Sequence, residues 1–235
     1  MKKIESINIM QKFSLFTEEW TPKIIGELNG QHVKICKLKD NFVWHSHENE
    51  DELFMVFKGT LFIDFRDGNT VEVNEGEIIS IDVGSIYNDY YGDHAKTFPV
   101  GEVDDARNKL LDVTKKSLEL GIHEVKDGKY IGDIGHAIQT FAEKNNFSVV
   151  KDLVGHGIGK TLHEEPQIPN FGLPNTGPEI KVGMCLAIEP MLNQGSDKII
   201  TKDDGWTIST SDGKLSAHFE HTVAVTEKGV KILTV

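Results

Sequence analysis

The chain has 235 residues, 38% of them hydrophobic and 26% charged, so it can bury a sizeable core as one large or two small domains. Its net charge of −12 argues against a nucleic-acid partner, because proteins that bind the phosphate backbone favour a basic surface. Two cysteines, Cys36 and Cys185, provide no disulfide framework and fit a cytoplasmic location. No N-terminal apolar run resembles a signal peptide, and no apolar stretch reaches about 18 residues, so we expect no membrane partner.

Residues 1–76 are predicted to form β-strands, with no helix of useful length. The segment QHVKICKL at 31–38 alternates between apolar and polar residues, as a half-buried strand does. Residues 52–65 contain two apolar runs on either side of Lys58-Gly59, which indicates a hairpin there. Asp67-Gly68 predicts a second tight turn.

The next two strands are expected to carry the first acidic residues of interest. IISIDVG and SIYNDYYGD, residues 78–93, have strand composition, with Asp82 and Asp93 near the strand ends. Since Gly76 leads directly into these strands without a linker, we expect one sheet to be shared across this junction.

Two helices are predicted farther along the chain, where the apolar period changes. Over residues 103–121 apolar side chains recur at helical spacing, Asp104-Asp105 favour the helix N-terminus and Gly121 is expected to end it. A second helix is predicted over residues 131–146, ending at Asn145-Asn146. The remainder is predicted as strands and loops, so the fold class is α+β.

Five residues in separate local motifs stand out as candidate metal ligands. They are Asp82 in IDVG, Asp93 in YYGDHAKTFPVG, His156 in GHGIG, Glu189 in AIEPM and Glu220 in HFEHTVAVT. Four carboxylates and one imidazole suit a pair of divalent metals that share bridging carboxylates. They suit neither a closed zinc site, which favours Cys and His, nor a nucleophilic triad. Taken singly, the strand aspartates could be solvated turn residues.

These motifs resemble those of the type I methionine aminopeptidases, a branch of the pita-bread metallopeptidases. The resemblance covers residues 77–235. The two aspartates stand eleven residues apart, and GHGIGKTLHEEPQIPNFG, IEPM, Gly205-Trp206 and FEHT follow in the order found in that family. The resemblance implies a pita-bread fold and removal of N-terminal methionine from peptides and nascent chains. It also implies two metal ions, which could be Mn, Fe, Co or Zn.

The resemblance also implies a role for each ligand. Asp82 would bind one metal with both oxygens, and Asp93 and Glu220 would bridge the two metals. His156 and Glu189 would complete the shell of the other metal.

Three residues would act on the substrate. Glu189 would also transfer a proton, and His163 would contact the oxygen of the scissile peptide bond. Trp206 matches an aromatic residue at the rim of the family's pocket. Without the resemblance, His163 could be a surface histidine and Trp206 a residue of the core.

The first 76 residues resemble instead the front half of a small cupin. His45, His47 and Glu52 form HxHxxxxE, and Gly59 follows after six residues. This motif implies a possible second metal site. The predicted domains are therefore an incomplete cupin-like barrel over 1–76 and a catalytic domain over 77–235. The catalytic domain would lack its N-terminal subdomain.

Two alternatives remain beside the aminopeptidase hypothesis. The missing subdomain would supply a substrate-binding histidine and part of the pocket wall, so the chain could be a metal-binding remnant with little or no activity. It could also be a cupin-type ligand-binding module. In each case the unpaired apolar strands of the β segment are expected to pair with a second copy, which predicts a homo-oligomer.

Overall fold

The computed structural model describes residues 7–28, 31–41, 54–64, 66, 68, 70–203, 205 and 207–234. The chain divides into two compact units, Met1–Leu53 and Phe54–Val235. No helix among the described residues is long and apolar enough to cross a membrane.

The first unit contains a short helix and one hairpin. Helix α1 (Ile9–Phe13) begins at Asn8, whose side chain accepts the N–H of Gln11. Strands β1 (Lys23–Leu28) and β2 (Gln31–Ile35) pair in antiparallel orientation. The strand predicted at 31–38 is therefore present, although it ends three residues early.

The second unit opens with the hairpin of β3 (Thr60–Asp64) and β4 (Thr70–Asn74). A turn was predicted at Asp67-Gly68, between these strands, but Asp67 lies outside the described residues. The hairpin predicted at Lys58-Gly59 is wrong, because residues 54–59 form no strand and β3 takes β4 as its partner. Gly59 has a φ of +87°, a conformation that interrupts a strand.

The predicted half-barrel over residues 1–76 is not supported by the described residues. Its strands form two separate two-stranded sheets, β1–β2 and β3–β4. Nor is one sheet shared across Gly76, because the strand that follows it pairs with its own hairpin partner. Apolar runs here made strands, but short local hairpins took the place of the long-range pairing that a barrel needs.

Strands β5 (Ile78–Tyr87) and β6 (Tyr90–Pro99) form a long hairpin. Its two-residue loop, Asn88-Asp89, has φ values of +50° and +64°, which Asn and Asp tolerate and which match the twist of the strands. Because the turn falls here, Asp82 and Asp93 lie inside the strands, and the prediction that they lie near the ends is wrong. Asp82 pairs with Ala95 and Asp93 with Gly84, so both carboxylates lie on one face of the hairpin.

Helices α2 (Asp105–His123) and α3 (Ile131–Lys144) confirm the two predicted helices. The side chain of Asp104 accepts the N–H of Arg107 and caps α2, while Asn145 ends α3. Gly121 does not end α2 as predicted. It is buried within the helix, where an added Cβ would lie 2.8 Å from the side chain of Ile138 on α3. A local stop signal was in fact a point of close helix packing.

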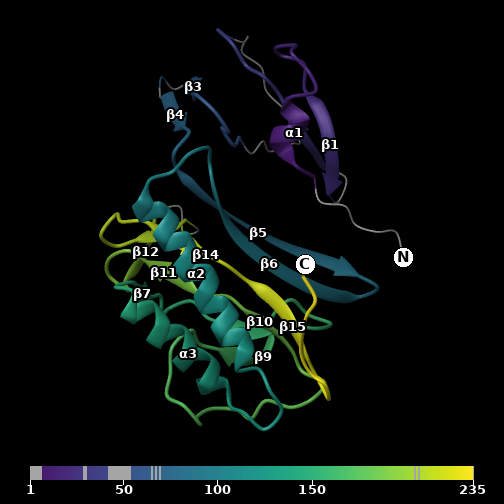
Figure 1. Cartoon of the computed structure of the whole chain (residues 1–235), viewed down its shortest axis with the longest axis vertical. Helices are drawn as coiled ribbons and strands as arrows, with labels where there is room; N and C mark the ends of the chain where they lie inside the picture. The colour runs from purple at the N-terminus through teal and green to yellow at the C-terminus, as the bar shows by residue number, and fades with distance from the viewer. Residues whose placement is uncertain are drawn as a thin grey trace. The chain divides into compact units, whose positions relative to one another are not determined.

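The helices pack against two antiparallel sheets, with α2 and α3 side by side (Figure 1). The larger sheet has the order β16-β15-β10-β8-β9, and a smaller one has the order β14-β11-β7. The strands of the larger sheet are β16 (Gly229–Ile232), β15 (His221–Thr226), β10 (Cys185–Ile188), β8 (Gly155–Gly157) and β9 (Glu164–Ile168). Those of the smaller sheet are β14 (Ser216–His218), β11 (Met191–Asn193) and β7 (Ser148–Val149). Strands β12 (Ile199–Thr201) and β13 (Ile208–Thr210) form a separate pair. The apolar core lies between helices and sheets, which confirms the α+β class.

Candidate metal centre

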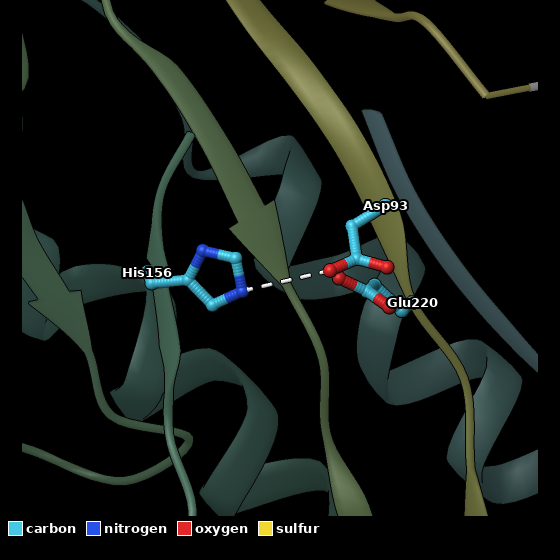
Figure 2. Close-up of side chains that lie close together, drawn as sticks. All are labelled: Asp93, His156 and Glu220. Carbon is cyan, nitrogen blue, oxygen red and sulfur yellow. Dashed lines mark ion pairs between the residues drawn. The ribbon is translucent and has the colours of Figure 1, made fainter. Parts of the chain in front are cut away.

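Three of the predicted ligands converge from distant parts of the sequence. Asp93 comes from β6, His156 from β8, and Glu220 from the link between β14 and β15 (Figure 2). One ligand atom from each lies within 4.8 Å of the others. The exposed fractions of the three residues are 8%, 8% and 1%, so the group is almost fully buried.

The glycines on both sides of His156 allow its strand to fit between two neighbours. A Cβ on Gly155 would lie 2.3 Å from the carbonyl oxygen of Ala187, and one on Gly157 would lie 2.3 Å from that of Glu165. The ring is oriented by a contact of 2.9 Å between Nδ1 and the carbonyl of Gly157. Since a carbonyl only accepts, Nδ1 carries the proton and the lone pair of neutral His156 is on Nε2.

Glu189 follows directly after β10, and its carboxylate lies between two imidazoles. Oε1 is 3.5 Å from Nε2 of His156, and Oε2 is 3.5 Å from Nε2 of His218. The backbone carbonyl of Glu189 accepts the side-chain amide of the fully buried Asn170 at 3.2 Å. Glu189 and His156, which were predicted to share one metal's shell, therefore lie next to each other.

His218 was not among the predicted site residues. Its Nε2 is buried without a hydrogen-bond partner among the described residues and faces Glu189. It stands two residues before Glu220 in HFEHT, and alternate residues of an extended chain point to the same side. This alternation of side chains is the sequence signal that would have identified His218 as a site residue.

Asp82 lies at the more open side of the group. Desolvation raises the pKa of its carboxyl, as do the charges of Asp93 and Glu189, while His218 acts in the opposite direction. The structure therefore brings all five predicted ligands to one site, although Asp82 keeps contact with solvent.

The electrostatics of the group call for added positive charge. Burial raises the pKa of Glu220 to about 10, with further contributions from the carboxylates of Glu189, Asp93 and Asp82. Its Oε1 has no hydrogen-bond partner in the part of the chain that the structure describes. Within the described ranges, the ion-pair partners of these carboxylates are histidines and not lysines or arginines. Hard oxygen donors with an unmatched negative charge fit divalent metal ions.

An open cavity of about 800 Å³ gives access to the group. It is lined by Asp82, His156 and Glu189, and also by His163 and His218. His163 lies in the turn between β8 and β9, where it is exposed and its ring meets that of His156 edge-on, with centroids 4.4 Å apart. A small molecule or chain end that enters the cavity can thus reach the carboxylates of Asp82 and Glu189 and three histidines together.

Four predicted site residues, His45, His47, Glu52 and Trp206, lie outside the described residues. The cupin-like cluster and the aromatic residue at the pocket rim therefore stay predictions.

Comparison with known proteins gives one family across most of the chain. The family model for Metallopeptidase family M24 matches residues 37–227. The match begins inside the segment predicted to be cupin-like, so that resemblance is not supported. Methionine aminopeptidase 1 of Bacillus subtilis is 55% identical over 162 residues, which are 69% of this chain and 65% of that protein. The chain thus spans just under two thirds of the length of this curated relative.

Solved structures agree with this comparison. The crystal structure of methionine aminopeptidase from Thermotoga maritima is 49% identical and superposes with a TM-score of 0.68, covering 69% of this chain and 65% of that one. The enzyme from Rickettsia prowazekii is 44% identical with a TM-score of 0.69, covering 72% and 68%. The second unit therefore has the pita-bread fold implied by the sequence motifs.

Proposed function

Because this chain belongs to metallopeptidase family M24, we propose that it is a dinuclear-metal-dependent aminopeptidase that removes N-terminal methionine from peptides and nascent proteins. The observation that carries the proposal is the buried convergence of Asp93, His156 and Glu220 beside an open cavity. The named relatives, at 44–55% identity, supply the choice of reaction and substrate. A cytoplasmic location follows from the same proposal, since nascent chains are made there.

We assign the metal-binding role to five residues, Asp82, Asp93, His156, Glu189 and Glu220. The support is their common position and the unmatched charge of the carboxylates. The native metal would be Mn, Fe, Co or Zn. When bound, such ions would supply Lewis-acid polarisation of a carbonyl and a water of lowered pKa.

Two residues of the chain would act directly on the substrate. His163 is exposed in the cavity beside the His156 ring, so its imidazole can donate to the oxygen of the scissile carbonyl as negative charge develops there. Glu189 faces the same cavity and can accept a proton on a carboxylate oxygen and then donate it to the departing amine. For Trp206, which lies outside the described residues, we propose a place at the rim of the pocket on the resemblance alone.

A second candidate function has one observation in its favour. The chain spans 65% of the length of its Bacillus subtilis relative. A protein that keeps the metal ligands without the rest of the relative's length could bind metal and turn over peptide weakly or not at all. This is the metal-binding remnant, and its peptide-binding surface would be incomplete.

One assay separates the two functions. Purified protein with added Co or Mn is incubated with a Met-Ala-Ser peptide, and free methionine is measured. Isothermal titration calorimetry of the same protein without added metal measures metal binding. The His156→Ala, Glu220→Ala double variant is the control.

We expect about two ions per chain and methionine release, both lost in the control. Metal binding without release would favour the remnant. No binding above the double variant would refute the metal centre itself.

A further inference from the structure

The backbone that carries Glu220 is attached to β6 in an unusual way. Segment 218–222 runs antiparallel beside β6, which carries Asp93, and the two bridge at Lys96 and Phe219. Figure 1 shows β6 and β15 as neighbours at this place. In an ordinary antiparallel pair, alternate residues exchange two backbone hydrogen bonds. Here side chains make most of those bonds, and we call this contact the β6 seam.

Two threonine hydroxyls hold the ends of the β6 seam. The hydroxyl of Thr97 accepts the N–H of His218 and donates to the carbonyl of the same residue, both at 2.8 Å. The hydroxyl of Thr222 accepts the N–H of Asp93 at 2.9 Å and donates to its carbonyl at 2.8 Å. A hydroxyl has one proton to donate and lone pairs to accept with, so each threonine can fill both roles at once.

Glu220 lies midway between the two threonine contacts. Its N–H donates to the carbonyl of Ala95 at 2.8 Å. Its carbonyl accepts from Nδ1 of His94, because a carbonyl cannot donate. Along segment 218–222, the contacts of Thr97 and Thr222 are thus two residues before and two residues after Glu220. A shift at either end of the seam would move the Glu220 carboxylate against that of Asp93.

Burial makes these hydroxyls hard to replace. Thr97 and Thr222 are each 2% exposed, and Glu220 is 1% exposed. Without a hydroxyl, an N–H and a carbonyl on the opposite backbone would be left unpaired where water has little access. The backbone would have to move to recover partners, and the attached side chains would move with it.

We propose that Thr97 and Thr222 are positioning residues of the metal centre. The Thr222 hydroxyl fixes the backbone of Asp93, and the Thr97 hydroxyl fixes that of His218, whose imidazole faces Glu189. Neither threonine touches substrate or metal in this role. The inference rests on the proposed metal centre, but not on the peptidase reaction.

The test removes each hydroxyl while keeping the shape of the side chain. Thr97→Val and Thr222→Val are isosteric deletions, and Thr97→Ser and Thr222→Ser restore the hydroxyl. Thr114→Val is the matched control, since Thr114 is also fully buried but donates only to Leu110 in its own helix, at 2.7 Å. Binding of Co²⁺ is measured by isothermal titration calorimetry, and its ligand geometry by the visible absorption spectrum. Circular dichroism checks the fold.

We expect each valine variant to bind Co²⁺ about 10–100-fold more weakly, the range found when partners of metal ligands are removed. Its Co²⁺ spectrum should also change. The serine variants and Thr114→Val should match the unaltered protein in affinity and spectrum.

Three results would overturn the inference. The first is unaltered affinity in both valine variants, and the second is an equal loss in Thr114→Val, which would indicate general destabilisation. The third is lost Co²⁺ affinity in a serine variant that is folded. This third result keeps the test decisive even if a valine variant does not fold. If the unaltered protein itself binds no Co²⁺, the proposed metal centre fails instead, and the two failures are distinguished.

Discussion

Glu220 offers a test of the charge balance that does not depend on catalysis. Its pKa is raised from 4.5 to about 10, chiefly by burial. In metal-free protein at neutral pH the folded state therefore holds a proton on Glu220 that the unfolded state has lost. Such a group stabilises the fold fully below pH 4.5, and this contribution is lost as pH rises toward 10.

The size of the effect follows from the slope for one proton. Stability should fall by about 1.4 kcal/mol for each pH unit within that window. Between about pH 6 and pH 8, the free energy of unfolding should thus decrease by roughly 3 kcal/mol through Glu220 alone. Glu220→Gln keeps a neutral side chain of the same shape and should lose this part of the slope. The raised pKa of Asp82 acts in the same direction in both proteins.

The assay is urea denaturation of both proteins in the presence of a chelator at several pH values. The difference between the two stability curves isolates Glu220, since other groups are common to both. Parallel curves for the two proteins would refute the reasoning, because they would show that Glu220 is not protonated in the folded state. Calorimetry of the unaltered protein in buffers of different ionisation enthalpy gives an independent check, since metal binding at neutral pH should release the proton held by Glu220.

Three further predictions concern catalysis, packing and assembly. His163→Ala should lower kcat by about 10²–10³-fold, the loss typical of one oxyanion donor, while calorimetry shows unchanged metal affinity; a parallel loss of metal binding would contradict the role. Gly121→Ala should destabilise the protein by about 1–3 kcal/mol in urea denaturation, because its new methyl group would press on Ile138, and unaltered stability would argue against close helix packing. The first unit leaves Ile24 and Val33 exposed on its hairpin, so light scattering should give a mass above the 26.3 kDa of one chain, and a monomer at micromolar concentration would exclude this pairing.

Local sequence signals predicted the parts of the fold that depend on local physics. Asp104 and Asn145 mark helix ends because a cap is set by the residues within one turn of it. The candidate ligands were recognisable for a related reason. His156 stands between glycines that close strand packing requires. The metal-binding side chain and the backbone requirement around it can therefore both be recognised within the same few residues.

Signals with two physical meanings gave the errors. Gly121 could end a helix or allow two helices to touch, and only the position of Ile138, which depends on the path of the chain between them, decides which. The apolar run before Gly59 could pair with β3 or leave the sheet. Strand formation depends on burial and on the side chains of the neighbouring strands, so the partner is fixed by the whole fold and not by the run itself.

The β6 seam shows why the rest of the site could not be found from motifs. Thr97 and Thr222 are ordinary strand residues, and threonine is common in strands whatever its role. Their significance arises when residues 121 and 129 positions apart along the sequence are placed side by side, so that one hydroxyl can serve two backbone groups. The same holds for His218, whose backbone is fixed by Thr97 and whose ring faces Glu189. A sequence can name the groups that bind a metal, but the groups that hold those ligands are defined by contacts between strands.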